Sequence, residues 1–173
     1  KNSLSKKMFI SRYKEIYKGD KNWLKIKTSR NNNYKWNISS SYIKKPPFFE
    51  DDFIKKERDI LNARILVLLG DSITTDHISP AGSIKQESPA GDYLSKLQIS
   101  KSNFNSYGSR RGNHEVMMRG TFANTRIRNI MLKNLEGGMT FSFVSKKVMP
   151  IYDAALEYNK LNIPLVVIAG KEY

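Results

Sequence analysis

The aliphatic stretch at residues 63–69 constrains the fold of this chain more than any other feature. It is rich in Ile, Val and Leu and ends at Gly70, as a strand buried on both faces of a sheet does. A second stretch of the same kind, residues 165–169, is entered by Pro164 and ends at Gly170. Doubly buried strands are typical of sheets covered by helices, so the sequence predicts a domain of the α/β class.

The residues between these two stretches predict the rest of the domain. Ser88-Pro89 is a typical helix start, which favours a short helix over 89–97. Residues 139–149 alternate partly between apolar and polar side chains, as a strand does. A helix over 151–161 would place its apolar side chains on one face. This β…α-β order predicts an α/β or β/α barrel-like domain over residues 60–173.

The first 59 residues predict an appendage to that domain. Apolar side chains in 2–18 recur at approximately helical spacing. Residues 27–41 are rich in Asn, Ser and Lys, as an irregular linker is. The Pro-Pro-Phe-Phe run at 46–49 favours extended backbone with two aromatic side chains to dock on a surface. We therefore expect residues 1–59 to form a basic linker, first helical and then extended.

The formal net charge of +14 is concentrated near the N-terminus. Residues 1–50 carry 13 Lys and Arg against 3 Asp and Glu, a net charge of +10, whereas the other 123 residues carry +4. Such a segment is either a solvated Lys/Asn-rich stretch from a compositionally biased genome or an electrostatic footprint for phosphates. Composition leaves both interpretations open.

The absence of cysteine excludes several kinds of site within this chain. It excludes disulfides, a thiol nucleophile and a cysteine-ligated iron–sulfur cluster. His77 and His114 are the two histidines, so we expect no self-contained metal site. No apolar run approaches the roughly 20 residues that span a bilayer, and the first residues lack the apolar core of a signal peptide. We therefore expect a cytoplasmic protein with no membrane partner.

The polar loop 70–82, directly after the first aliphatic stretch, is the first candidate site. Asp76 beside His77 could orient an imidazole or bind an arginine, and the nearby hydroxyls could hold a carboxylate or phosphate. The alternative is a capped, hydrogen-bonded turn without further function.

Two further stretches carry arginines. In 105–115, Arg110 and Arg111 lie between glycines, which suits bidentate anion binding. The alternative is a surface loop with two solvated arginines. The stretch 119–124 indicates little by itself.

Long strings of this sequence resemble the aconitase superfamily, and within it the cytosolic aconitase and iron-regulatory protein branch. Residues 163–173 resemble the strand that precedes the family's active-site serine loop. The other resembling strings are 36–37, 41–44, 46–50, 70–82, 104–113 and 116–124. The resemblance spans almost the whole chain, and strings of this length are specific signals.

The resemblance implies a role within a larger enzyme. Members of the family have four domains and isomerise citrate to isocitrate, and three of the domains hold a [4Fe–4S] cluster through three cysteines. The fourth domain swivels over the cleft and supplies arginines for the substrate carboxylates and a serine base. This chain resembles that fourth domain, so its implied partners are the three preceding domains and citrate or isocitrate, and the cluster is not bound by this chain. Asp76 and His77 fall at site-lining positions.

Two departures from the family pattern affect the expected activity. The serine loop should follow Tyr173, so we expect these residues to catalyse nothing by themselves. The family's substrate-binding arginine falls at Leu97, and its following glycine at Gln98. Lys96 is adjacent to Leu97, but a point charge cannot reproduce the planar fork of arginine. We expect weak or absent isomerase activity unless Lys96, Arg110 or Arg111 compensates.

The resemblance also implies an alternative function. Iron-regulatory proteins of this branch lose the cluster and bind an RNA stem-loop called the iron-responsive element. By resemblance, the RNA-binding candidates here are Ser79, Pro80, Ser83, Lys85 and Gln86, since a protruding loop can read an unpaired base. Pro80 could instead only rigidify its turn. A third possibility is a folded fragment that has no function without its partner domains.

Overall fold

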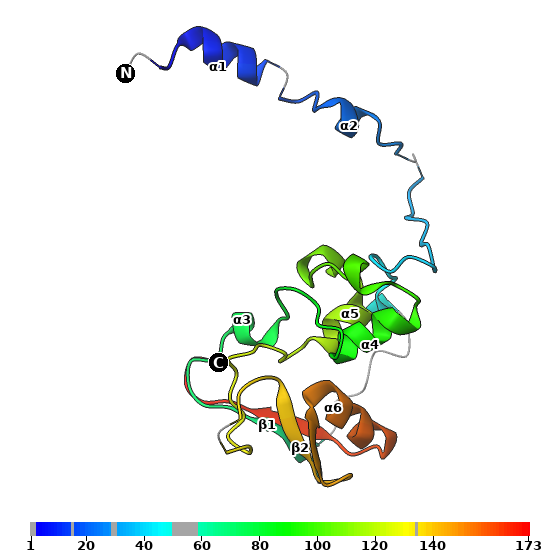
Figure 1. Cartoon of the computed structure of the whole chain (residues 1–173), viewed down its shortest axis with the longest axis vertical. Coiled ribbons are helices and arrows are strands. Elements are labelled where there is room, and N and C mark those ends of the chain that lie inside the picture. The colour runs from blue at the N-terminus through cyan, green and yellow to red at the C-terminus, as the bar shows by residue number, and fades with distance from the viewer. Residues whose placement is uncertain (1–2, 15, 29–30, 50–58, 134) are drawn as a thin grey trace. The chain divides into compact units, whose positions relative to one another are not determined.

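The structure is a computed structural model that describes residues 3–14, 16–28, 31–49, 59–133 and 135–173. The chain divides into two units, Lys1–Lys35 and Trp36–Tyr173 (Figure 1). Each unit is described by itself below.

The first unit contains two short helices, α1 (Lys6–Tyr13) and α2 (Lys21–Leu24). The Ser5 side chain caps α1 by accepting the N–H of Met8, and the Asp20 carboxylate caps α2. No residue of either helix is buried. The helix expected over 2–18 is thus present but shorter, with Lys14 as its C-cap residue.

The second unit contains two small sheets. Strands β1 (Arg64–Leu68) and β4 (Leu165–Ile168) pair in parallel, while β2 (Met139–Ser142) and β3 (Lys147–Pro150) form an antiparallel hairpin. The two strands expected from the aliphatic stretches are confirmed, and the mixture of helix with a parallel pair fits the α/β class. Their expected burial on both faces is wrong, because only Leu66 and Val67 of β1, and no residue of β4, are buried. Barrel-like closure stays a prediction, because each sheet in the described part of the chain has two strands.

Helices connect these strands. The sequence anticipated α4 (Pro89–Lys96) and α6 (Ile151–Lys160) closely. As expected, Ser88 is the N-cap residue of α4 and Pro89 lies in its first turn. The Ser88 hydroxyl accepts the N–H of Gly91 at 3.1 Å. The elements that the sequence did not indicate are short: α3 (Thr75–Ile78), α5 (His114–Arg119), η3 (Lys101–Asn103) and η4 (Gly108–Arg110).

Two local expectations are corrected by the structure. Pro47–Phe49 forms a 3-10 turn, η1, where extended backbone was expected, and the Phe48 side chain is 60% exposed. Residues 139–149 form a hairpin and not one strand. The Ser142 hydroxyl accepts the N–H groups of Val144 and Ser145 and so folds the turn. It also donates to Glu157 at 2.5 Å, which lowers the pKa of that carboxyl.

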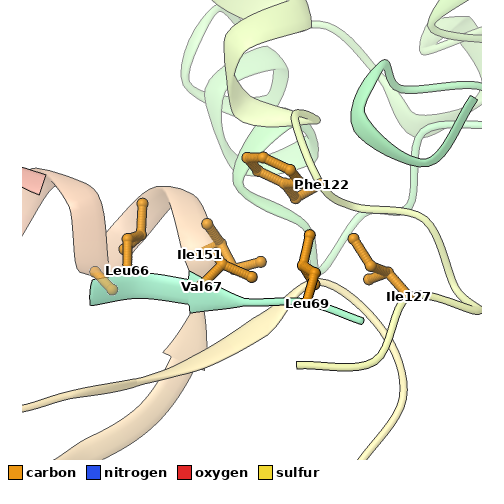
Figure 2. Packing of buried hydrophobic residues seen from close by; sticks show 7 residues of the cluster. Leu66, Val67, Leu69, Phe122, Ile127 and Ile151 are labelled. Atoms are coloured by element: carbon orange, nitrogen blue, oxygen red, sulfur yellow. The ribbon is translucent and has the colours of Figure 1, made fainter. Parts of the chain in front are cut away.

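The second unit has two hydrophobic clusters. The first packs β1 against α6 and the loop 122–127 (Figure 2), and its buried members are Leu66, Val67, Leu69, Phe122, Ile127, Ile151 and Ala154. The second packs α4 and α5 against the segment before α4 and the segment between the two helices. Its buried members are Ile84, Ala90, Leu94, Phe104, Tyr107 and Val116. The first cluster holds the strands whose ends form the candidate site.

Buried polar side chains complete the hydrogen bonds of β1. The pairing with β4 shifts register between Ile65 and Val67, and the carbonyl of Leu66 accepts the Thr140 hydroxyl at 2.6 Å. Asn129 donates to that hydroxyl at 3.0 Å and accepts the N–H of Leu68 at 3.2 Å. Side chains therefore satisfy backbone groups that a neighbouring strand would otherwise pair.

Replacing Thr140 with Val should destabilise the domain, because valine keeps the shape but leaves buried acceptor and donor groups unpaired. We expect a loss of about 1–3 kcal/mol in the free energy of unfolding, measured by urea denaturation. Thr75→Val, at an exposed threonine, is the matched control and should change stability by less than about 0.5 kcal/mol. Equal effects of both variants would contradict the role assigned to Thr140.

Candidate functional site

The carboxyl ends of β1 and β4 meet at one edge of the parallel pair, and polar groups join the segments that follow them. Asp71 accepts the N–H of Lys171 at 2.7 Å through its side chain. Ser72 donates its N–H to the Lys171 carbonyl at 2.8 Å. A Cβ atom at Gly170 would collide with the Asp71 carboxylate, so a larger residue there would displace the carboxylate from its position beside Lys171. The polar loop 70–82 and the residues before Tyr173 are thus held together.

His77 and Asp76 have different roles within α3. The His77 Nδ1 accepts the backbone N–H of Thr74 at 3.1 Å and lies 3.1 Å from the Thr74 hydroxyl. The imidazole therefore caps its own helix, and Asp76 does not orient it. The Asp76 carboxylate is exposed and has no hydrogen-bond or ion-pair partner within the described part of the chain. The loop 70–82 could be a ligand-binding site or a capped turn. His77 takes part in a capped turn, whereas the Asp76 carboxylate is available to a ligand.

Asp76 lines an open pocket of about 280 Å³ at this edge. The pocket joins the loop 70–82 to the stretch that begins at Arg119. Its lining residues are Asp76, Ser79, Ala81, Ala123, Asn124, Thr125 and Arg126. Sequence reasoning missed Arg126, which lies two residues beyond the resembling string 116–124. An arginine so near the end of such a string was a signal that could have found it.

The two loops around the pocket are tightly joined. The N–H of Phe122 donates to the carbonyl of Ile78 at 2.9 Å. Pro80 packs on Gly120, where a Cβ atom would lie 2.6 Å from the Pro80 Cβ. Pro80 therefore has a packing role in closing the loop, which corresponds to the structural alternative considered for it.

Arg110 is buried, with 1% of its surface exposed. Its guanidinium donates to the carbonyls of Phe104 and Asn103 at 2.7 Å each, and to the carbonyl and hydroxyl of Ser41 at 2.9 and 3.0 Å. It also lies 4.0 Å from the centre of the Tyr42 ring. These partners occupy the planar fork of the guanidinium, and carboxylate binding by Arg110 stays a prediction. Arg111 is exposed, as a solvated arginine would be.

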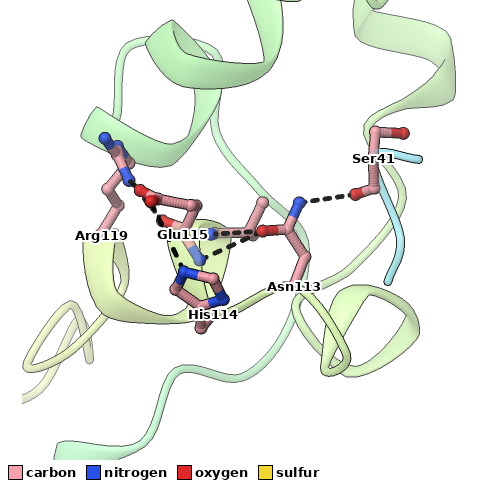
Figure 3. Close-up of polar contacts among 6 residues, drawn as sticks. Ser41, Asn113, His114, Glu115 and Arg119 are labelled. Carbon is pink, nitrogen blue, oxygen red and sulfur yellow. Dashed lines mark hydrogen bonds and ion pairs between the residues drawn. The ribbon is translucent and has the colours of Figure 1, made fainter. Parts of the chain in front are cut away.

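The same loop fixes the lead-in segment 41–45, here called the strap (Figure 3). Asn113 donates to the Ser41 carbonyl at 2.8 Å and caps α5 by accepting the N–H of Glu115 at 3.1 Å. The Lys44 N–H donates to the Gly112 carbonyl at 2.9 Å. The strap is therefore part of the folded second unit.

Arg119 is the second engaged arginine of this region. Its Nη1 pairs with Glu115 Oε2 at 2.5 Å, and its guanidinium lies 4.4 Å from the Tyr93 ring centre and 4.9 Å from that of Tyr152. Burial raises the pKa of the Tyr152 hydroxyl, an effect that Arg119 opposes. Arg119 thus connects α5 to α4 and α6 and does not face the Asp76 pocket.

The position of the family's missing arginine lies at the end of α4. Leu97 is the C-cap residue and is 44% exposed, and Lys96 pairs with Asp92 at 2.6 Å. Gln98 has φ +60°, and the next N–H, of Ile99, donates to the Leu94 carbonyl at 3.1 Å. This left-handed helix end favours glycine, which explains the glycine of the family pattern. Neither Lys96 nor Leu97 lines the Asp76 pocket.

The residues suggested for RNA binding do not share one pocket. Ser79 lines the Asp76 pocket, whereas Lys85 lines a separate opening of about 270 Å³ beside Pro89. Gln86 is exposed, and Ser83 forms an isolated bridge with Ser106. RNA binding by these residues stays a prediction.

The described residues do not provide a metal centre. They contain no group of three or more His, Cys, Asp or Glu side chains that could hold an ion. His114 Nδ1 is buried without a hydrogen-bond partner in the described structure, and its Nε2 lies 3.5 Å from Glu115. Because the chain has no cysteine, its residues do not fit an iron–sulfur cluster. Within the described ranges, no helix has the length and apolar character needed to cross a membrane.

Comparison with known proteins identifies the class of this domain. Residues 90–173 match the family described as Aconitase C-terminal domain, so this segment is similar to that family.

The relatives are bacterial proteins named aconitate hydratase A. The chain is 55% identical to the protein of Bradyrhizobium diazoefficiens over 96% of its own length, and 53% identical to that of Rickettsia felis over 99%. It is 56% identical to the protein of Legionella pneumophila over 96%. The chain spans about a fifth of the length of these curated relatives. They do not support the narrower placement in the iron-regulatory branch.

Replacing Arg110 with Ala should both destabilise the domain and release the strap, because three carbonyl acceptors lose their donor. We expect a loss of about 3 kcal/mol or more in unfolding free energy and faster hydrogen exchange at residues 41–45. Arg111→Ala removes the same charge from an exposed position and should leave both quantities nearly unchanged. Unchanged exchange of the strap in Arg110→Ala would contradict this assignment.

Proposed function

We propose that this chain is the swivelling C-terminal domain of an aconitate hydratase, and that it closes over the active site in which citrate and isocitrate are interconverted. The observation that carries the proposal is the exposed Asp76 carboxylate, which has no partner among the described residues, in a pocket at the edge where β1 and β4 end. Ligands of α/β sheets bind outside the carboxyl ends of the strands. The 53–56% identity to aconitate hydratases supports the same function.

The geometry of this edge suits a domain that completes a site formed elsewhere in the protein. Residues 171–172 are hydrogen-bonded to Asp71 and Ser72, so the serine loop expected after Tyr173 would begin beside the loop that carries Asp76. Serine and Asp76 would then reach the substrate from one edge. The three preceding domains would supply the [4Fe–4S] cluster through their cysteines, since this chain has none.

Asp76 and His77 have separate roles in this proposal. Asp76 would face the substrate, and a carboxylate in that place can accept the proton of a substrate hydroxyl in a hydrogen bond. His77 would hold α3 in shape through Thr74. Barrel-like closure of the domain is part of the proposal as well, since the described strands require further partners to form a barrel.

The substitution Asp76→Asn should therefore abolish most of the citrate turnover of the full-length protein without unfolding it. We expect a fall in kcat of about 10²-fold or more, on the scale of other charged groups that act only in a closed site. The matched control is Asp92→Asn, an exposed aspartate on α4 that pairs with Lys96, which should stay within about twofold. Equal activity of both variants would overturn the proposed role of Asp76.

The loss of the arginine at position 97 should weaken the enzyme, because two of the three expected substitutes are engaged elsewhere and the third, Arg111, is an exposed arginine of another loop. Lys96 is paired with Asp92 and Arg110 is buried. Leu97→Arg, alone and combined with Gln98→Gly, should raise kcat/KM for citrate by about 10-fold or more through a bidentate carboxylate contact.

Leu97→Lys is the control for that experiment, because it adds the charge without the planar fork. It should recover less activity than arginine does. No gain with Leu97→Arg would show that this position does not limit the enzyme.

A further inference from the structure

The Asn124 side chain bridges the two loops of the Asp76 pocket. Its Nδ2 donates to the backbone carbonyl of Asp76 at 3.2 Å, and its Oδ1 accepts the backbone N–H of Arg126 at 2.8 Å. One planar amide therefore fixes both the residue that carries the carboxylate and the residue that carries the guanidinium. A carboxylate side chain has no donor for the Asp76 carbonyl, and an aliphatic one has neither group.

The hydrogen bond between Phe122 and Ile78 also joins the two loops, and it holds Phe122 in a backbone conformation of unfavourable energy. Phe122, whose N–H bonds to the Ile78 carbonyl, has φ +61° and is 8% exposed. A bulky residue adopts this left-handed conformation at a cost that the surrounding packing must offset. Phe122 packs in the first hydrophobic cluster (Figure 2), so the core holds the loop 122–126 against the end of α3.

Arg126 differs from the engaged arginines of the domain. Arg110, Arg119 and Arg128 each donate to carbonyl or carboxylate oxygens. The Arg126 guanidinium is exposed and has no such partner among the residues that the structure describes, and it lines the pocket together with Asp76. A free planar fork on the wall of a pocket is suited to bidentate binding of a carboxylate.

The charges of the pocket indicate the kind of ligand. Asp76 would repel a ligand that is anionic throughout, whereas it can accept a hydrogen bond from a hydroxyl group. Ser79 and Thr125 add neutral hydroxyl groups to the lining. A cation and an anion in one small pocket therefore favour a hydroxycarboxylate, with the carboxylate at Arg126 and the hydroxyl at Asp76.

We propose that Arg126 binds a substrate carboxylate in the Asp76 pocket and that Asn124 is the residue that positions Arg126 and Asp76 for it. Citrate as the ligand rests on the function proposed above. The pair Arg126 and Asp76 would then select hydroxycarboxylates over simple anions.

The test compares Arg126→Gln with Arg128→Gln in the full-length protein. The two variants make the same charge change two residues apart, and Arg128 pairs with Glu136 outside the pocket. Arg126→Gln should raise the KM for citrate, and its Kd measured by calorimetry, at least tenfold, while Arg128→Gln should change both less than twofold. Calorimetry supplies the result even where turnover is slow.

Two outcomes separate this proposal from the proposed function. A wild-type protein that neither binds nor converts citrate would overturn both. Normal citrate conversion with equal constants in the two variants would overturn the role of Arg126 alone. Inorganic phosphate is the competing ligand: binding as tight as that of citrate, and lost in Arg126→Gln, would assign a phosphate site and overturn hydroxycarboxylate selection.

Asn124 is tested by two substitutions. Asn124→Ala should raise the KM for citrate several-fold, an increase larger than the accompanying fall in melting temperature would explain. Asn124→Ser, whose hydroxyl can both donate and accept a hydrogen bond, should recover part of the affinity. A lower melting temperature with an unchanged KM would show that Asn124 only stabilises the fold.

Discussion

The parallel pairing of β1 with β4 is the constraint on which the rest of the domain depends. The paired strands end at the same edge, so the loops that follow them must meet although a hundred residues separate Asp71 from Lys171. Asp71, Ser72 and Gly170 make that meeting close and specific. A site at this edge therefore follows from strand direction, and the residues of α3 and of the loop 122–126 determine its chemistry.

The arginines of this domain show how similar side chains reach different roles. Arg110 holds the strap through Ser41 and Tyr42, and Arg119 joins three helices. Arg110 is buried and Arg119 is partly buried, and both guanidinium groups are engaged in contacts within the domain. The backbone N–H of Arg126 donates to the Asn124 side chain, and Arg126 lines the Asp76 pocket. The domain thus uses Arg110, Arg119 and Arg128 as structural connectors, and their local sequence does not distinguish them from Arg126.

Several expectations from the sequence depended on local chemistry and were confirmed for that reason. Aliphatic runs with a terminal glycine identified β1 and β4, and Ser88-Pro89 identified the start of α4. Partial alternation over 139–149 was misleading, because Ser142 folds a turn that the alternation does not reveal. The site was identified only in part: Asp76 lies at a pocket, but His77 caps a helix and Arg126 was missed.

The α/β class, the lack of cysteine ligands and the polar loop that carries Asp76 could all be read from the sequence. These depend on residue type and on neighbours in the chain. The tertiary structure alone decided that Arg110 is buried beneath the strap and that Asn124 joins Asp76 to Arg126. The physical reason is that burial and hydrogen bonding between residues 48 or 69 positions apart arise from packing, which no local pattern encodes.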